Sequence, residues 1–204
     1  MTNIQGNEFI NMRKSVQQIA DEGRDSPGRV RRKVFISYHV ADEEQVRTFV
    51  SEYKDFFHFR CVGVTEKHDF VDSSSDEYIK RRIREDYLRD STVTILMVGK
   101  CTWSRHFVDW EISATLRNDS SNKRSGLVGI ALPELNGKWK LPDRARANWE
   151  KNDPGKSYMV AINYPKTVKV LFDAVEAAYD KRDSGTVPVD NSLPLPKFNK
   201  PCNG

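Results

Sequence analysis

Three short and uninterrupted apolar runs constrain the fold most strongly, namely Val34–Tyr38 (VFISY), Val93–Val98 (VTILMV) and Gly126–Leu132 (GLVGIAL). Runs of this length that are rich in β-branched residues are typical of strands buried on both faces of a parallel sheet. Two less regular segments, Phe59–Val64 and Tyr158–Ile162, are further strand candidates. Because helical spacing of apolar residues separates these runs, the sequence predicts an α/β fold with a flavodoxin-like parallel sheet and helices on both faces.

The helical pattern after the first run also predicts where a ligand binds. Asp42 is expected to cap this helix, with Gln45 three residues later, and a final helix is expected to begin at Pro165. Ligands of parallel sheets bind outside the carboxyl ends of the strands. That rule gathers residues 37–42, 65–75 and 99–105 around one crevice.

The chain of 204 residues suits one domain with tails. Residues 1–32 are expected to form an N-terminal extension and linker, and residues 33–182 the domain, with an insertion at 133–157. The insertion contains two tryptophans among basic residues, and such a loop usually packs its tryptophans and leaves its charges in solvent. Residues 183–204 contain four prolines and are expected to be a disordered tail.

Charge and cysteine content narrow the function classes. The net charge of +4 is small and spread along the chain, so nucleic acid is not an expected partner. No apolar run approaches the ~20 residues of a membrane span, and no membrane partner is expected. Three cysteines without CxxC spacing argue against a disulfide framework and against a zinc site, so we expect no metal and a reducing cytoplasm.

The segment 105–116 (RHFVDWEISATL) contains the candidate catalytic residue, Glu111. At 3.6 residues per turn, Glu111 falls at the margin of an apolar stripe, and a carboxylate at the edge of a core is costly unless it is paired or used. The alternative is a surface glutamate that forms a salt bridge with Arg105 or Arg117. Periodicity alone favours neither interpretation.

Several common chemistries lack their motifs here. The chain has no phosphate-binding GxxxxGK[ST] loop, no GxGxxG after a strand, no GxSxG elbow and no HExxH pair. A lone carboxylate suffices to stabilise the oxocarbenium-like sugar that forms when an N-glycosidic bond breaks. The nicotinamide–ribose bond of NAD is a plausible target, because its leaving group departs neutral and needs no general acid.

Four segments in the same order resemble the TIR-like proteins of bacteria, and in particular the signal-generating TIR subunit of Thoeris antiphage defence systems. They are VFISYHVADEE, LRDSTVTILMVG, TWSRHFVDWEI and GLVGIALP, within residues 33–133. The resemblance implies a flavodoxin-like fold with Glu111 as the catalytic glutamate. It further implies that NAD is the substrate, with no separate cofactor, that nicotinamide is released, and that a cyclic ADP-ribose isomer signals to a separate effector protein. Self-association into a homo-oligomer is also implied.

The resemblance also implies that NAD binds near the Ser37–Tyr38 turn and under the loop at 65–75. Tyr38 is a candidate for stacking on a base or ribose, although a terminal strand aromatic can equally be simple packing. Asp72 and Ser73 are candidates for binding ribose hydroxyls, although capping of the helix that begins near Ser75 explains them with fewer assumptions.

Two more candidates flank Glu111. Arg105 is a candidate for binding the pyrophosphate, or it pairs with Asp109. Trp110 points away from the apolar stripe and could line the cleft, contact a neighbouring subunit or cover an adjacent loop. A TIR-like scaffold that recruits a partner without turning over NAD is the alternative function.

Overall fold

The chain folds around a five-stranded sheet in which all strands are parallel, in the order β2-β1-β3-β4-β5. This computed structural model describes residues 16–20, 31–61, 73–120, 123–150 and 152–203. The strands are β1 (Lys33–Ser37), β2 (His58–Arg60), β3 (Val93–Val98), β4 (Gly126–Ala131) and β5 (Val160–Asn163). The predicted flavodoxin-like α/β fold is therefore confirmed. Residues 62–64 of the predicted second strand lie outside the described residues.

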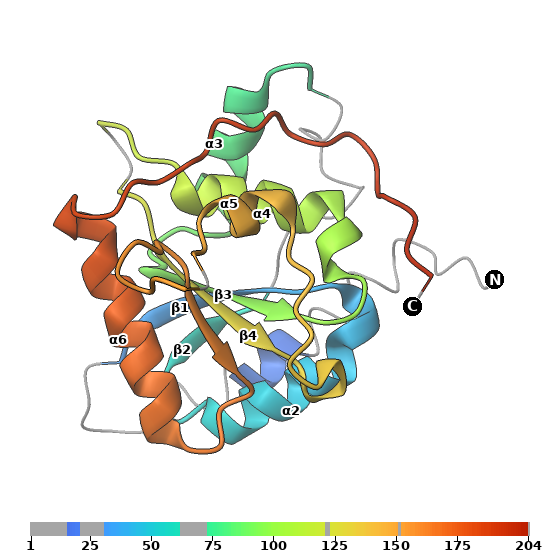
Figure 1. The fold of residues 1–204 in the computed structure, drawn as a ribbon, viewed down its shortest axis with the longest axis vertical. Helices are drawn as coiled ribbons and strands as arrows, with labels where there is room; N and C mark the ends of the chain where they lie inside the picture. Colours follow the sequence, from blue (N-terminus) through green and yellow to red (C-terminus); the bar gives the residue numbers. More distant parts are fainter. Residues whose placement is uncertain (1–15, 21–30, 62–72, 121–122, 151, 204) are drawn as a thin grey trace.

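Helices cover both faces of the sheet (Figure 1). One face is covered by α2 (Glu43–Tyr53) and α6 (Val168–Ser184), and the other by α3 (Asp76–Asp86), α4 (His106–Leu116) and the short α5 (Asp143–Ala147). The final helix begins slightly later than Pro165, because the hydroxyl of Thr167 accepts a hydrogen bond from the backbone N–H of Val170 and so caps it.

Strand alternation divides the core into two layers. Along β1, Val34 and Ile36 pack with α2 and α6, whereas Phe35 packs with α3 and α4. Successive side chains of a strand point to opposite faces, so Ser37 follows Phe35 toward α4. This alternation decides which residues at the end of β1 can reach Glu111.

Part of the expected N-terminal extension contributes to the core. Residues 16–20 are helical, and Val16 and Ala20 are buried beside β2. The Gln17 side chain donates to the carbonyl of Phe59 and accepts from the N–H of Cys61. This segment therefore pairs with backbone groups at the edge of the sheet, which an exposed edge strand would leave unpaired.

The insertion contains the crossover helix between β4 and β5. Trp139 and Trp149 pack against each other with ring centroids 5.8 Å apart, as expected. Its charges are not all in solvent, however, because Arg144 of α5 is fully buried. The guanidinium binds the Asp109 carboxylate at 3.0 Å, which explains how a charge is tolerated there.

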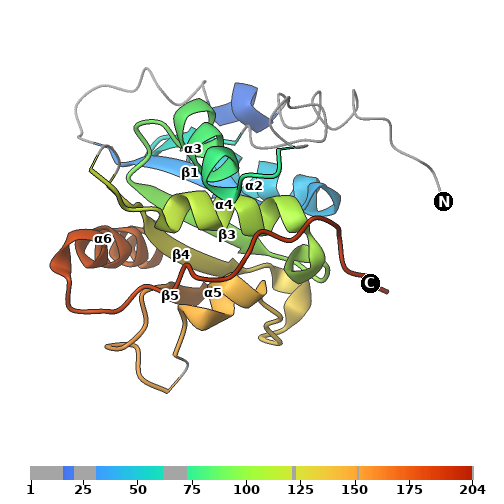
Figure 2. The same ribbon diagram turned by 90° about the horizontal axis from the view of Figure 1, so that it is seen from above.

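The expectation of a disordered tail is wrong for the described residues 186–203, which we call the C-terminal strap. The strap follows the left-handed residue Gly185 and runs across α4 and α5 (Figures 1 and 2, red). Val187 and Leu195 are buried, and backbone carbonyls of the strap accept hydrogen bonds from Arg144 and Trp110. Prolines favour extended backbone without internal hydrogen bonds, and this backbone is satisfied instead by the helices beneath it.

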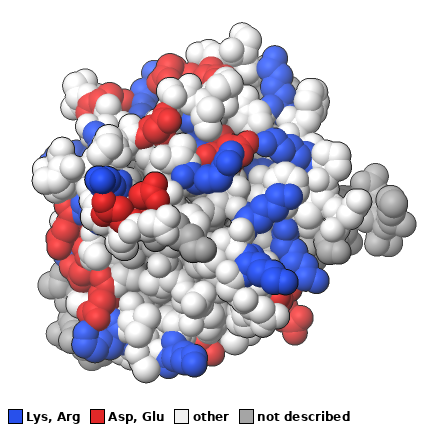
Figure 3. Space-filling view, viewed as in Figure 1, with Lys and Arg blue, Asp and Glu red and all other residues white. Residues whose placement is uncertain are grey.

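A disulfide joins Cys101 to Cys202, which corrects the expectation that the cysteines form no such bond. Their separation of 101 residues gave no local spacing signal. Within the described ranges, no helix is both long and apolar enough to cross a lipid bilayer. Basic and acidic side chains both occur across the face shown in Figure 3.

Candidate functional site

The candidate site lies where the strand order reverses, at the carboxyl ends of β1 and β3. The two strands pair in parallel from Val34 to Ser37, and the chain then leaves β1 toward α2 and β3 toward α4. In open parallel sheets, ligands bind beside two adjacent strand ends whose connections depart to opposite faces. We call this place, between Ser37 at the end of β1 and Gly99 directly after β3, the crevice. The cavity beside the strap and the one beside Arg84 are not lined by either residue.

Glu111 is fully buried, with an exposed fraction of 0%, and faces the end of β1. The Ser37 hydroxyl donates to Glu111 Oε2 at 2.6 Å. The alternative of a surface salt bridge is wrong, since Arg117 binds Asp119 at 2.6 Å and Arg105 binds groups in its own loop. The structure therefore brings together Ser37 and Glu111 from two elements that lie 74 residues apart.

The backbone below Glu111 is held by two threonines. The Thr115 hydroxyl lies 2.8 Å from the Glu111 carbonyl and 2.8 Å from the Thr94 hydroxyl of β3. Both threonines are fully buried. Glu111 is thus fixed by its side chain to β1 and, through Thr115, to β3, so both strands of the crevice position the carboxylate.

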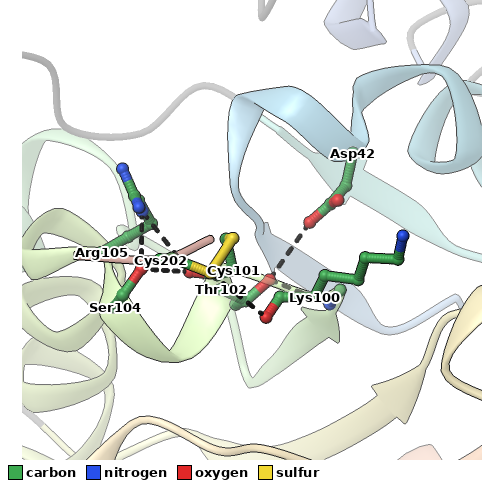
Figure 4. The surroundings of a disulfide bond; sticks show 8 residues. Asp42, Lys100, Cys101, Thr102, Ser104, Arg105 and Cys202 are labelled. Atoms are coloured by element: carbon green, nitrogen blue, oxygen red, sulfur yellow. Dashed lines mark hydrogen bonds between the residues drawn. A yellow bond between two sulfur atoms is a disulfide. The ribbon is translucent and has the colours of Figure 1, made fainter. Parts of the chain in front are cut away.

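A second buried carboxylate, Asp42, lies at the same end of the sheet (Figure 4). It does not cap α2, because its side chain makes no capping hydrogen bond. Instead Thr102 Oγ1 donates to Asp42 Oδ2 at 3.1 Å and accepts from the N–H of Gly99 at 2.9 Å. These contacts join the loop after β1 to the loop after β3 across the crevice.

The surroundings of Asp42 favour its neutral form. Burial raises the pKa of Asp42 to about 6, and the hydrogen bond from Thr102 limits the rise. Gly99 packs directly against this carboxylate, and a Cβ at position 99 would overlap it. A larger residue after β3 would therefore displace the Asp42 side chain from its position beside Thr102.

Tyr38 does not join Ser37 at the crevice. Its ring is fully buried in the layer formed with α2 and α6, on the face of the sheet opposite to Glu111. Ser37 and Tyr38 are consecutive in the sequence, and strand alternation sends their side chains to opposite faces. The position of Tyr38 favours the packing interpretation.

Of the two predicted ribose-binding residues before α3, the structure describes only Ser73. Asp72 lies outside the described residues, as does most of the predicted loop at 65–75. Ser73 Oγ accepts from the backbone N–H of Ser75 at 3.2 Å, and Ser75 caps α3 by accepting from the N–H of Tyr78. Ser73 is thus engaged in the turn that begins α3, as the capping interpretation holds.

Arg105 immediately precedes α4. Its Nε lies 3.0 Å from Ser104 Oγ and 3.4 Å from the Cys101 carbonyl, and burial lowers its pKa. The proposed partner Asp109 binds Arg144 instead. Arg105 lines a cavity of about 240 Å³ between the start of α4 and the strap. The residue therefore lies near a cavity, but on the outer side of α4.

Trp110 is covered by the strap. Its exposed fraction is 3%, and its indole N–H donates to the Pro196 carbonyl at 2.8 Å. His106 and Phe107 pack against the same ring. Of the alternatives that the sequence leaves open for Trp110, covering a neighbouring segment of its own chain agrees with this position.

Sequence reasoning missed two features around the site. The Asp42–Thr102 contact was hidden because Asp42 has the sequence pattern of a helix cap. The buried Asp109–Arg144 pair was hidden among the basic residues of the insertion, and burial raises the pKa of Asp109 while Arg144 counteracts the rise. Within the described part of the chain, no group of three or more potential metal ligands is assembled.

Comparison with known families identifies one match. The model of the family described as "Thoeris protein ThsB, TIR-like domain" matches residues 35–137, slightly more than half of the chain. The matched range contains the last three residues of β1 and all of β2, β3 and β4, and so includes Ser37, Asp42, Thr102 and Glu111. No curated protein matches the chain.

Proposed function

The chain belongs to the Thoeris ThsB TIR-like domain family, and from this premise we propose that it is the TIR module of a Thoeris defence system that cleaves NAD, with Glu111 as the catalytic residue. The observation that carries the proposal is a buried carboxylate, oriented by Ser37, at the strand-end crevice of this fold. One correctly placed negative charge is enough to stabilise the oxocarbenium-like sugar that forms when this bond breaks.

The proposed reaction breaks the bond between nicotinamide and ribose. Positive charge develops on the sugar as the neutral nicotinamide departs, and a carboxylate stabilises that charge most effectively where water is excluded. The Ser37 hydroxyl holds one oxygen of Glu111, so the carboxylate keeps its orientation as the charge develops. Thr115 and Thr94 keep the helix backbone at a fixed distance from β3.

Exclusion of water also determines the product. When water is kept from the ribosyl cation, a nucleophile within the same molecule can attack it, and the product is a cyclic ADP-ribose isomer. We propose that this product acts as a diffusible signal to a separate effector protein. The proposal includes self-association of the chain into a homo-oligomer, as the resemblance implies.

The full burial of Glu111 bears on how the substrate reaches it. A carboxylate with an exposed fraction of 0% contacts a dinucleotide only after neighbouring groups shift. The proposed enzyme is therefore closed in this structure and opens when activated. The same burial is the observation that favours the second candidate, a scaffold in which Glu111 only ties α4 to β1 and recruits a partner without chemistry.

The replacement of Glu111 by glutamine tests the proposal. Gln keeps an oxygen that accepts from Ser37 but removes the charge, so we expect nicotinamide release to fall by on the order of 100-fold or more. The assay incubates NAD with extract from infected cells that express the wild-type chain or the variant, and identifies products by mass spectrometry.

Two controls make the result specific. Glu85→Gln changes an exposed glutamate of α3 and should leave the rate unchanged. The melting temperature of purified Glu111→Gln should stay near that of the wild type. Nicotinamide release at the parent rate by Glu111→Gln would rule out the catalytic assignment, and no product from the wild type in such extract would favour the scaffold.

A further inference from the structure

The disulfide between Cys101 and Cys202 joins the end of the strap to the loop that connects β3 to α4 (Figure 4). We propose that these two cysteines form a reversible thiol–disulfide site. In this proposal a dithiol reductant opens the bond and releases residues 197–203, the outer end of the strap, from the start of α4. Residues 187–196, the inner part of the strap, remain bound.

The two parts of the strap are held in different ways. The inner part buries Val187 and Leu195 and accepts a hydrogen bond from the indole of Trp110. Arg144 donates to two of its carbonyls at 2.8 and 3.2 Å. From residue 197 to residue 203, every residue except Cys202 is exposed, and the exposed fraction of Phe198 is 81%. The outer end therefore gains little from burial.

Non-covalent contacts of the outer end are few. The Asn199 side-chain oxygen accepts from the backbone N–H of His106 at 3.0 Å, and the backbone N–H of Lys200 donates to the Ser104 carbonyl at 2.9 Å. The ion pair between Lys200 and Asp143 is about half exposed on both sides, and such pairs contribute little.

A cavity of about 240 Å³ lies between the start of α4 and the strap. It is lined by residues 193–196 of the inner part as well as by Phe198 and Lys200 of the outer end, so it does not distinguish the two parts. What distinguishes them is that the outer end has no fully buried apolar side chain. The disulfide is therefore the contact that fixes the outer end against the helix.

The chemistry of the proposed site is ordinary thiol–disulfide exchange. Cys101 and Cys202 are partly exposed, whereas Cys61 is buried. A thiolate of the reductant attacks one sulfur and forms a mixed disulfide, and its second thiol displaces that sulfur. Two electrons and two protons pass to the protein, which gains two thiols, and the reductant becomes a disulfide. In reducing compartments, disulfides that form are usually transient and redox-sensing.

Reduction of the disulfide affects the crevice through two neighbouring contacts. Asn199 caps the first turn of α4, the helix that contains Glu111, and it lies three residues before Cys202. Cys101 directly precedes Thr102, whose hydroxyl holds Asp42 across the crevice (Figure 4). Reduction therefore loosens the start of α4 and the loop at 99–105.

Hydrogen–deuterium exchange of the full chain tests the proposal, without any need for NAD cleavage. The wild-type protein is oxidised with glutathione disulfide or reduced with dithiothreitol, and exchange is followed by mass spectrometry. Reduction should speed the exchange of the Lys200 and His106 amides by on the order of tenfold or more, since their acceptors, the Ser104 carbonyl and the Asn199 side chain, separate from them when the segment frays. Residues 187–196 should keep their protection, and reoxidation should restore the slow rates.

Cysteine variants give the matched controls. Cys202→Ser should exchange like the reduced wild type under both conditions, whereas Cys61→Ser should respond to reductant like the wild type. Equal exchange of the Lys200 and His106 amides in the oxidised and reduced wild type would overturn the proposal. So would alkylation of Cys101 and Cys202 in the oxidised sample, or release of residues 187–203 as one unit on reduction.

Discussion

At the scale of single residues, Asp42 has the most distinctive electrostatic environment at the crevice. Its pKa is raised from 3.8 to about 6, chiefly by burial. The folded state therefore keeps a proton over a pH range in which the unfolded chain has lost it. The stabilisation from this proton is complete below the unfolded pKa and is lost as the pH rises through about 6.

Asp42→Asn should remove this pH dependence, because the amide is neutral throughout. At about 1.4 kcal/mol per pKa unit, the wild type should lose about 3 kcal/mol relative to the variant between about pH 4 and pH 7.5. Urea unfolding of both proteins across this range measures the difference. Parallel stability curves for the two proteins would show that Asp42 does not hold the proton.

The contact between Ser37 and Glu111 can be isolated in the same way. Ser37→Ala removes the donor at 2.6 Å and leaves a fully buried carboxylate without it, which should cost about 1–3 kcal/mol of unfolding free energy. In a double-mutant cycle with Glu111→Met, which removes the acceptor, Ser37→Ala should become much less costly. Ser51→Ala, at an exposed position of α2, is the matched control and should change stability by less than about 0.5 kcal/mol. Additive effects of Ser37→Ala and Glu111→Met would contradict this interaction.

At the scale of elements, Arg144 joins α5 to α4 and to the strap. Arg144→Met leaves the Asp109 carboxylate buried without its partner and two strap carbonyls without their donor, so stability should fall by about 3–5 kcal/mol. Arg146→Met on the same helix breaks only an exposed pair with Asp143 and should cost less than about 1 kcal/mol. Urea unfolding distinguishes the two, and equal losses would show that burial of Arg144 is unimportant.

The elements also show which features the sequence could predict. The strands β1, β3 and β4 were predictable, because a short apolar run by itself indicates a strand that is buried in a sheet. The Glu111 helix was predicted with one apolar stripe, but all of its residues except Phe107 are buried. Its outer side is covered by α3, α5 and the strap, and no pattern within α4 reports these distant neighbours.

The site was predictable only in part, for the same reason. The sequence singled out Glu111 and Ser37, and the structure brings their side chains together. Their roles toward NAD stay predictions. The bond between Cys101 and Cys202 spans too many residues to leave a spacing signal, and the partners of Arg144 include backbone carbonyls, which every residue possesses. The prolines of the strap suggested disorder, although their extended backbone suits the groove over α4.

At the scale of the whole molecule, the two faces of the sheet are covered in different ways. On one side α2 and α6 pack directly on the strands. On the other side the polar edges of α4 and α5 need the strap, which supplies acceptors to Arg144 and Trp110 and buries Leu195 against α3 and α4. The strap is therefore part of the fold, and α4, the helix that contains Glu111, is enclosed between the sheet and the strap.

Two shortened chains test this conclusion. A chain that ends after Pro196 keeps the inner part of the strap and loses mainly the disulfide, which should cost about 2–4 kcal/mol. A chain that ends after Gly185 also uncovers Trp110 and removes three acceptors of the buried Arg144, namely the Asn191 side chain and two strap carbonyls. Its loss should exceed about 5 kcal/mol, the lower end of the stability of a typical domain, so it should be largely unfolded. Near-ultraviolet circular dichroism and urea unfolding measure both chains. If the chain that ends after Gly185 proved as stable as the one that ends after Pro196, the domain would be complete without the strap, as proline content alone suggests.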